Sequence, residues 1–161
     1  MAVQKTNVMR ILDQQKVAYQ PYEYPHGTQP VDGCTVAQIL GRDPAQVFKT
    51  LVARGASGGY FVFVIPADLA LDLRKAARAV SEKSVSMLHV KELLPLTGYV
   101  RGGCSPIGMK KAFPTVVDET AQLFDTILVS AGKIGAQVEL APDELCRLVG
   151  AHYADITTGE S

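Results

Sequence analysis

The segment best suited to chemistry is a glycine-rich stretch in the second half of the chain. Residues 98–108 read GYVRGGCSPIG, with four glycines and one proline in eleven positions. Adjacent glycines allow backbone conformations that other residues adopt only at a cost, and they let a ligand approach the main chain. Pro106 removes a backbone donor and restrains φ, which gives the stretch a defined shape. Its N–H groups suit a carbonyl, an ester or a phosphate oxygen, although a plain turn between two strands would have a similar composition.

This stretch does not match the phosphate-binding loop of nucleotide triphosphatases. Gly103 and Gly108 have the spacing of that loop, but Met109 occupies the lysine position and Lys110 follows one residue late. No serine or threonine comes next, and Pro106 deletes an N–H from the cradle. The sequence therefore excludes a triphosphatase of that class.

Cys104 lies in the same stretch but has no activating partner in the sequence. A catalytic thiol needs a base or a local positive field, and the histidines at positions 26, 89 and 152 are tied to Cys104 by no motif. Neither an H-x-x-x-H spacing nor a C-x-x-C pair indicates a metal site. We interpret Cys104 as a small packing residue.

Lys49 is the second candidate, because it interrupts an apolar strand pattern. In a strand, Val47, Lys49, Leu51 and Ala53 share one face, which puts the ammonium group between apolar neighbours. A lysine buried without a partner is costly. The side chain therefore either reaches solvent at a sheet edge or faces a cleft, where it meets a phosphate or an ester oxygen.

The turn at residues 130–133, with the sequence SAGK, is the third candidate. It begins with Ser130 and separates two predicted strands. A plain hairpin turn and a ligand-binding loop both fit this composition.

The elements that must position these residues follow no repeating βαβ order. Helical spacing and capping predict helices that begin at Thr6, Thr35, Asp68, His89 and Pro142. Strands are predicted at 17–24, 47–53, 60–66, 85–87, 115–118, 126–130 and 137–140. We expect an α+β fold with a curved, mainly antiparallel sheet or partial barrel flanked by helices, formed by residues 1–161 as one domain.

The composition limits the classes of partner. The 161 residues carry 16 basic and 16 acidic side chains, so no global positive field exists to bind long nucleic acid, although a local contact with a nucleic-acid end is allowed. Three well-separated cysteines fit a reducing compartment. The polar N-terminus and the lack of an apolar run of about 18 residues predict a cytoplasmic location.

Taken in order, the segments around Lys49, at 97–108 and at 129–133 resemble the YbaK family of free-standing aminoacyl-tRNA editing proteins. The resemblance extends over nearly the whole chain and includes the G-x-x-x-P element from Gly102 to Pro106. Cys104 stands where the family often has an apolar residue. The resemblance implies a Cys-tRNA(Pro) deacylase, with the editing fold of the insertion domain in bacterial prolyl-tRNA synthetases.

The resemblance also implies the site. Lys49 corresponds to the family's strand lysine near the terminal adenosine and phosphate, Gly102 opens the loop that holds the aminoacyl ester, and Ser130 matches the second-loop serine. Tyr24, or Tyr22 two residues before it, matches a tyrosine that precedes the first loop. No metal or cofactor is implied.

The implied mechanism uses the substrate's own thiol. That thiol attacks the ester carbonyl and cysteine leaves as a cyclic thiolactone, so the protein has to fold the aminoacyl group and stabilise an oxyanion. Backbone N–H groups around Gly102 and Gly103 could do this without a general base. The substrate would be the acceptor end of tRNA(Pro), and prolyl-tRNA synthetase is a possible partner. The alternatives are a hydrolase of Ala-tRNA(Pro) or another small aminoacyl-tRNA, and a non-catalytic module that binds tRNA ends or the synthetase.

Overall fold

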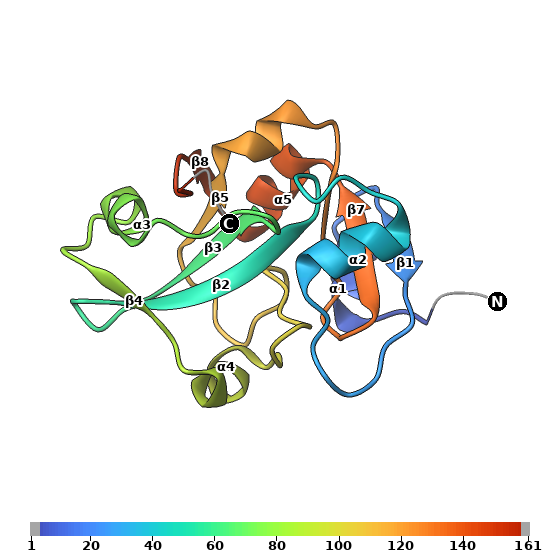
Figure 1. Ribbon diagram of the computed structural model, residues 1–161, viewed down its shortest axis with the longest axis horizontal. Helices are drawn as coiled ribbons and strands as arrows, with labels where there is room; N and C mark the ends of the chain where they lie inside the picture. The colour runs from blue at the N-terminus through green and yellow to red at the C-terminus, as the bar shows by residue number, and fades with distance from the viewer. Residues whose placement is uncertain (1–3, 159–161) are drawn as a thin grey trace.

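The computed structural model describes residues 4–158 and contains two β-sheets with helices packed around them (Figure 1). The ends of the predicted 1–161 domain, and the first three residues of the polar N-terminus, lie outside the described residues. The helices are α1 (Asn7–Gln14), α2 (Gly33–Leu40), α3 (Leu73–Ala79), α4 (Val90–Thr97), the 3-10 helix η1 (Glu119–Leu123) and α5 (Pro142–Val149). The strands are β1 (Gln20–Glu23), β2 (Phe48–Gly55), β3 (Tyr60–Pro66), β4 (Val85–Met87), β5 (Thr115–Asp118), β6 (Ile127–Ser130), β7 (Ala136–Leu140) and β8 (His152–Ala154).

The larger sheet has the strand order β4-β2-β3-β5-β8, and the smaller one has the order β1-β7-β6. The β2–β3 hairpin is antiparallel as predicted, whereas β3 pairs with β5, and β5 with β8, in parallel. The two sheets meet where Val47, just before β2, forms a parallel bridge with Leu128 of β6. The predicted α+β class is confirmed, with two adjoining sheets in place of one curved sheet.

Strand β3 shows why the core has two parts. Its residues alternate between the two faces of the sheet, as the period of two requires. Val62 and Val64 pack into the cluster that α1 and α5 cover, while Phe63 and Ile65 pack into the cluster beneath α3. Both faces of this central strand are therefore buried, which explains its continuous run of apolar residues.

Three helix starts test the capping predictions. Thr6 caps α1 as predicted, since its hydroxyl accepts a hydrogen bond from the N–H of Met9. Asp32, not Thr35, caps α2, and Asp72, not Asp68, caps α3. In both wrong cases the helix begins where a carboxylate accepts hydrogen bonds from N–H groups two or three residues later, the usual geometry of an N-cap.

One further strand was not expected, because the short strand β8 had no recognisable pattern in the sequence. Pro95 lies inside α4, which continues to Thr97. None of the helices within residues 4–158 is long and apolar enough to cross a lipid bilayer.

Candidate active site

Four of the residues singled out in the sequence converge on one small pocket. This inner pocket of about 90 Å³ lies where the two sheets meet, and its lining includes Tyr24, Lys49, Gly102 and Ser130. The other lining residues are Val31, Gly33, Val36, Val47, Phe48, Thr50, Cys104 and Gln137. Segments far apart in the sequence thus supply a single cavity.

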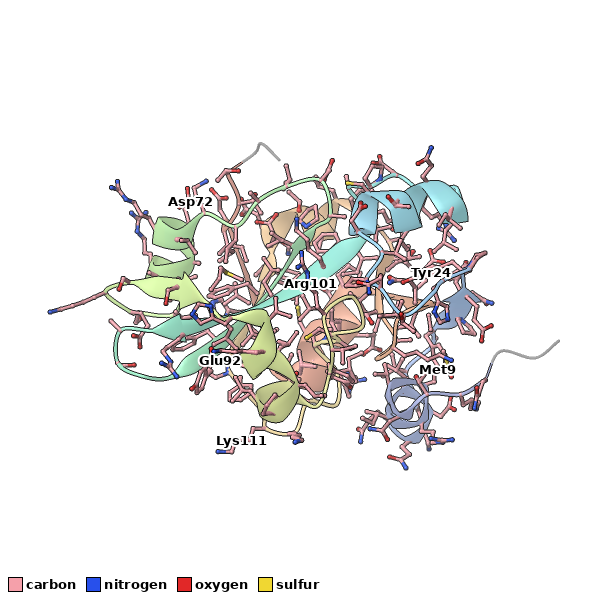
Figure 2. The ribbon with its side chains drawn as sticks, turned by 60° about the horizontal axis from the view of Figure 1, so that its bottom comes forward. Met9, Tyr24, Asp72, Glu92, Arg101 and Lys111 are labelled. Carbon is pink, nitrogen blue, oxygen red and sulfur yellow. The ribbon has the colours of Figure 1, made fainter. Side chains whose placement is uncertain are left out.

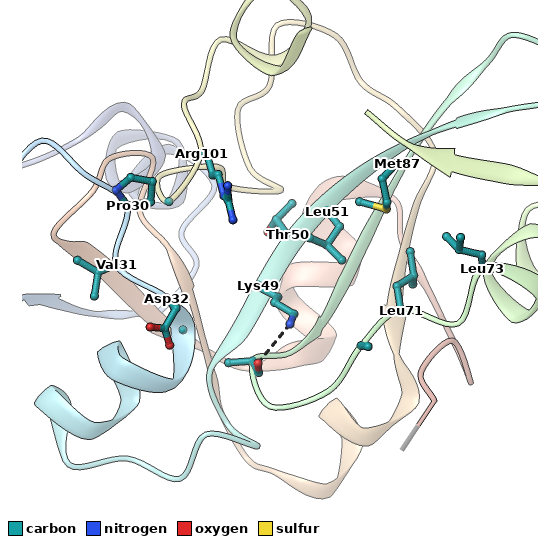
Figure 3. Close-up of a pocket in the computed structure, with 14 residues that line it drawn as sticks. Pro30, Val31, Asp32, Lys49, Thr50, Leu51, Leu71, Leu73, Met87 and Arg101 are labelled. Atoms are coloured by element: carbon teal, nitrogen blue, oxygen red, sulfur yellow. Dashed lines mark hydrogen bonds between the residues drawn. The ribbon is translucent and has the colours of Figure 1, made fainter. Parts of the chain in front are cut away.

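Lys49 is half-buried on β2 and lies at the boundary between the inner pocket and a wider cleft. Its Nζ donates a hydrogen bond of 3.2 Å to the carbonyl oxygen of Ala67 (Figure 3). An ammonium group has three donors, so this one bond leaves two for a ligand. Because Lys49 is the only charged residue among the described residues that line the inner pocket, an anionic or strongly polar ligand group is favoured there.

The wider cleft, the outer groove, has a volume of about 790 Å³ and shares five lining residues with the inner pocket: Val31, Gly33, Lys49, Thr50 and Gly102. Figure 3 shows its two sides, with Pro30, Val31 and Asp32 across from β2. A ligand anchored in the inner pocket can therefore extend directly into the groove.

Gly102 occupies a position that only glycine fits well. Its φ is +87°, and an added Cβ would lie 2.8 Å from Cβ of Pro30. The glycine-rich loop is also held from within, because Tyr99 donates its hydroxyl hydrogen to the carbonyl of Ile107. The N–H of Gly103 donates to the carbonyl of Val100 at 3.0 Å, so that group is already engaged in the turn.

The remaining predicted residues have clear placements. Ser130 is buried, and its hydroxyl oxygen accepts a hydrogen bond of 3.1 Å from the N–H of Gly132, which leaves the hydroxyl hydrogen available. Gly103 packs against the second loop, since an added Cβ would lie 2.9 Å from Cα of Lys133. Pro106 is buried within its own loop and lines neither the inner pocket nor the outer groove.

Three polar side-chain atoms around the inner pocket have no hydrogen-bond partner among the described residues. They are the hydroxyl of Tyr24, the hydroxyl of Thr50 and the amide oxygen of Gln137. Buried polar groups are nearly always paired, and each unpaired one costs about 1–3 kcal/mol. Their clustering at a single cavity points to a polar ligand that supplies the missing partners.

Thr50 and Gln137 were missed by the sequence reasoning. Strand alternation places Thr50 on the opposite face from Lys49, yet both line the inner pocket. Among the described residues, β4 pairs with β2 only at residues 53–55, so the ladder between these two strands does not extend to Lys49 and Thr50. Gln137 could have been recognised from the sequence, because a polar residue between the apolar residues Ala136 and Val138 of a strand is a candidate for a buried polar site.

Cys104 lines the inner pocket, but its environment suppresses thiolate formation. Burial raises the pKa of the Cys104 thiol to about 12. The neutral thiol is a poor nucleophile at neutral pH. Among residues 4–158, those that line the inner pocket include no histidine and no carboxylate, so they offer no general base.

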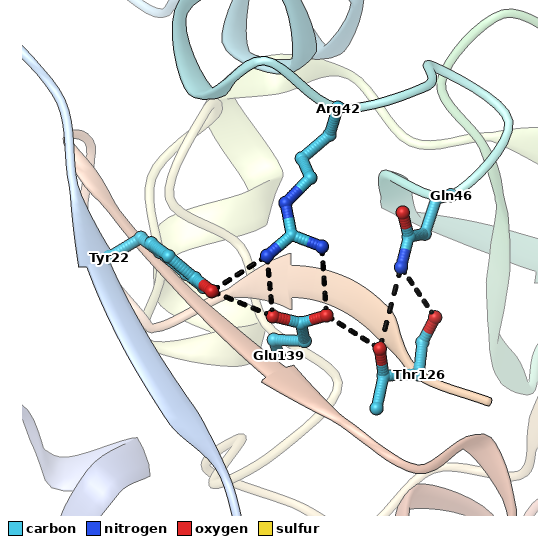
Figure 4. Close-up of polar contacts among 5 residues, drawn as sticks. All are labelled: Tyr22, Arg42, Gln46, Thr126 and Glu139. Carbon is cyan, nitrogen blue, oxygen red and sulfur yellow. Dashed lines mark hydrogen bonds and ion pairs between the residues drawn. The ribbon is translucent and has the colours of Figure 1, made fainter. Parts of the chain in front are cut away.

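Tyr22, the alternative to Tyr24, belongs to a different cluster (Figure 4). Its hydroxyl donates to Glu139 at 2.8 Å, and Arg42 binds both carboxylate oxygens of Glu139 at 2.8 and 3.0 Å. Thr126 completes the set by donating to Glu139 at 2.6 Å. This network joins β1 and β7 to the end of α2, so its role is structural, and Tyr24 is the tyrosine at the pocket.

Comparison with known proteins shows the family to which the chain belongs. The family model described as the aminoacyl-tRNA editing domain matches residues 30–148. The chain is 50% identical over 157 residues to EbsC of Enterococcus faecalis, named a proposed Cys-tRNA(Pro)/Cys-tRNA(Cys) deacylase, and the match covers 98% of this chain and 96% of that protein.

Solved structures show the same fold. The crystal structure of a proposed trans-editing enzyme for prolyl-tRNA synthetase matches with a TM-score of 0.81 at 27% identity, covering 97% of this chain and 100% of that one. The hypothetical protein APE2540 matches with a TM-score of 0.83 at 24% identity, covering 93% and 98% of the two chains, and supports the fold alone.

Proposed function

Because this chain belongs to the aminoacyl-tRNA editing domain family, we propose that it is a deacylase that removes cysteine from mischarged Cys-tRNA(Pro). The family resemblance read from the sequence is thereby confirmed. The observation that carries the proposed activity is the set of three unpaired polar atoms, from Tyr24, Thr50 and Gln137, around the pocket that Lys49 borders. An aminoacyl ester has an amino group and a carbonyl with which these atoms can pair.

In the proposed reaction the substrate provides the nucleophile. The cysteinyl sulfur attacks the ester carbonyl carbon, a C–S bond forms, and the C–O bond to the ribose breaks. The thiol proton passes to the departing ribose oxygen, so the products are tRNA with a free hydroxyl and a four-membered cysteine thiolactone. This route needs no general base from the protein, in keeping with the lining of the inner pocket.

The protein contributes positioning and electrostatic stabilisation. The inner pocket folds the aminoacyl group so that its sulfur and carbonyl carbon approach each other, which is the main requirement of an intramolecular attack. The N–H of Gly102 stabilises the developing oxyanion, and the Lys49 ammonium contacts an ester or phosphate oxygen. Ser130 donates its free hydroxyl hydrogen to the same group, and Gly103 and Pro106 keep the loop in place.

The partners follow from the same proposal. The acceptor end of tRNA(Pro) is the substrate, and prolyl-tRNA synthetase supplies mischarged tRNA, directly or through a complex. Equal numbers of acidic and basic residues fit a protein that contacts only the tRNA end. We place the activity in the cytoplasm, on a single editing domain that comprises residues 1–161.

The deciding experiment compares three substrates: Cys-tRNA(Pro), Ala-tRNA(Pro) and Cys-tRNA(Pro) with a methylated thiol. We expect only the first to lose its ester faster than it does spontaneously. Loss of the alanyl or methylated ester at a similar rate would instead identify a hydrolase that uses water. Binding of all three without turnover would identify a non-catalytic module.

A matched pair of lysine variants tests the site. Lys49→Ala should lower the deacylation rate by about 100-fold, the order expected when one donor to a developing charge is lost. Lys83→Ala removes the same charge from an exposed position before β4 and should retain full activity. Full activity of Lys49→Ala would contradict the assignment of this lysine.

A further inference from the structure

Arg101 projects into the outer groove from the side opposite β2 (Figure 3). Its side chain is exposed, and its guanidinium has neither a hydrogen bond nor an ion pair among the described residues. It precedes Gly102, which borders the inner pocket. An uncompensated guanidinium therefore lies beside the exit of the candidate active site.

The charge of the groove favours an anion. Its lining contains two cations, Lys49 and Arg101, and one carboxylate, Asp32. Hydrogen bonds from the hydroxyl and N–H of Thr35 occupy Asp32, and they lower the pKa of its carboxyl group. Asp32 thus completes the cap of α2, whereas the guanidinium of Arg101 is free to bind a phosphate in the bidentate geometry that arginine prefers.

The opposite side of the groove is apolar. It is formed by Leu51 of β2, Met87 of β4, Leu73 at the start of α3, and Leu71 in the segment that precedes α3. Leu73 and Met87 are large apolar side chains with 44% and 43% of their surface exposed. An apolar surface facing a cation is what a single-stranded nucleotide requires, since its base has an apolar face and its backbone is anionic.

We propose that the outer groove holds the single-stranded 3′ end of the tRNA, with Arg101 on the phosphate before the terminal nucleotide and the terminal adenine against Leu73 and Met87. This assignment rests on the proposed function, because an aminoacyl group seated in the inner pocket makes its ribose emerge at Lys49 and Gly102. Those two residues border both cavities, so the terminal nucleotide enters the groove directly.

Two substrates separate the phosphate contact from the base contact. Cysteinyl-tRNA(Pro) carries the phosphate, whereas cysteinyl-adenosine has the terminal base and ester but no phosphate. Arg101→Ala should raise KM for the tRNA by about tenfold and leave cysteinyl-adenosine unchanged. Met87→Asp should raise KM for both substrates, because it places a polar charged group against the base.

The control is Arg10→Ala, which removes an exposed arginine from α1. Figure 2 shows α1, labelled at Met9, well away from Arg101. This variant has the same change in net charge and should behave as wild type. The Arg101→Lys variant, which keeps the charge but loses the bidentate fork, should recover only part of the affinity.

Binding of uncharged tRNA(Pro) keeps the groove testable without turnover. The slope of log affinity against log salt should fall by about 0.7 in Arg101→Ala, the value for one lost phosphate contact on a single strand. If wild type fails to deacylate but this change in slope appears, the groove assignment stands and the proposed function fails. Unchanged tRNA affinity and slope in Arg101→Ala would overturn the assignment.

Discussion

Ser130 on β6 and Gln137 on β7 are direct partners across the antiparallel ladder, and both line the inner pocket. They differ in how their polar atoms are satisfied. The hydroxyl oxygen of Ser130 accepts a hydrogen bond from Gly132, whereas the amide oxygen of Gln137 has no partner among the described residues. The β6–β7 pair therefore presents to the same cavity one hydroxyl that is held by a hydrogen bond and one amide oxygen that is unpaired. Gln137 is one of the three residues with an unpaired polar atom at this pocket, with Tyr24 and Thr50. Removing such an atom should slow the reaction without destabilising the fold.

Thr50→Val tests this separation most directly, because it replaces an unpaired buried hydroxyl by a methyl group of similar shape. We expect the free energy of unfolding to stay unchanged or rise by about 1 kcal/mol, since the desolvation penalty of the hydroxyl disappears. Deacylation should slow, since the ligand loses a partner. Denaturant unfolding and single-turnover rates measure the two effects.

The control is the same substitution at Thr97. That residue is also buried, but its hydroxyl donates a hydrogen bond of 2.7 Å to the carbonyl of Leu93. Thr97→Val should therefore destabilise the protein by about 1 kcal/mol. If Thr50→Val proves equally destabilising, its hydroxyl has a partner after all and the argument for a ligand is weakened.

Gly102→Ala should be destabilising for two separable reasons. The positive φ of +87° strains any residue with a Cβ, and the added Cβ would lie 2.8 Å from Pro30. Gly58 has a φ of +94° but nothing within 4 Å of an added Cβ. Gly58→Ala should cost about 1–2 kcal/mol from the backbone alone, and Gly102→Ala should cost more.

Thermal or denaturant unfolding of the two glycine variants measures this difference. Equal losses would show that the loop shifts away from Pro30 at no cost. Gly102→Ala should also abolish deacylation at temperatures where it remains folded, while Gly58→Ala, in the β2–β3 turn, should retain it.

The fold and the candidate site could each be predicted from the sequence only in part. Strand alternation and turn composition were sufficient for the β2–β3 hairpin, because its signals are local. Local signals do not specify parallel pairing between distant strands, and so β8, which pairs with β5, was missed. Lys49 and Gly102 stood out by residue type, whereas Thr50 is an ordinary strand residue whose place at the site depends on the tertiary arrangement of the two sheets.

Cys104 should fill space beside the inner pocket and take no chemical part in deacylation. With its pKa raised to about 12 by burial, the thiol stays protonated throughout the neutral range. Cys104→Ala should retain deacylation within about threefold, because no step needs its thiolate. The pH dependence of the rate should be the same in the variant and the wild type.

Thiol labelling of the native protein provides an independent measurement. Cys34 is exposed, while Cys104 and Cys146 are buried, and burial also raises the pKa of Cys146. One thiol should therefore react rapidly, and Cys34→Ser should remove that fast phase. Rapid labelling of Cys104 would show that the glycine-rich loop moves to expose this thiol, which is buried in the structure.

Glu139 should make stability depend on acid pH. Burial raises the pKa of this carboxyl group, but hydrogen bonds from Thr126, Tyr22 and Arg42 outweigh burial, and the net pKa lies below the ordinary value of 4.5. A carboxyl group with a lowered pKa in the folded state stabilises the protein at pH values above 4.5. That contribution is lost as the pH falls through the lowered value, because the unfolded state binds the proton first.

Glu139→Gln removes the charge from this network and should lower the free energy of unfolding at pH 7 by roughly 1–3 kcal/mol, since Arg42 loses its carboxylate. Its stability should then fall less steeply than that of wild type below pH 4.5. Glu144→Gln, which breaks an exposed pair with Arg147, should change stability by less than about 1 kcal/mol. If the free energy of unfolding falls equally steeply with decreasing pH in wild type and in Glu139→Gln, Glu139 is not the group responsible for this pH dependence.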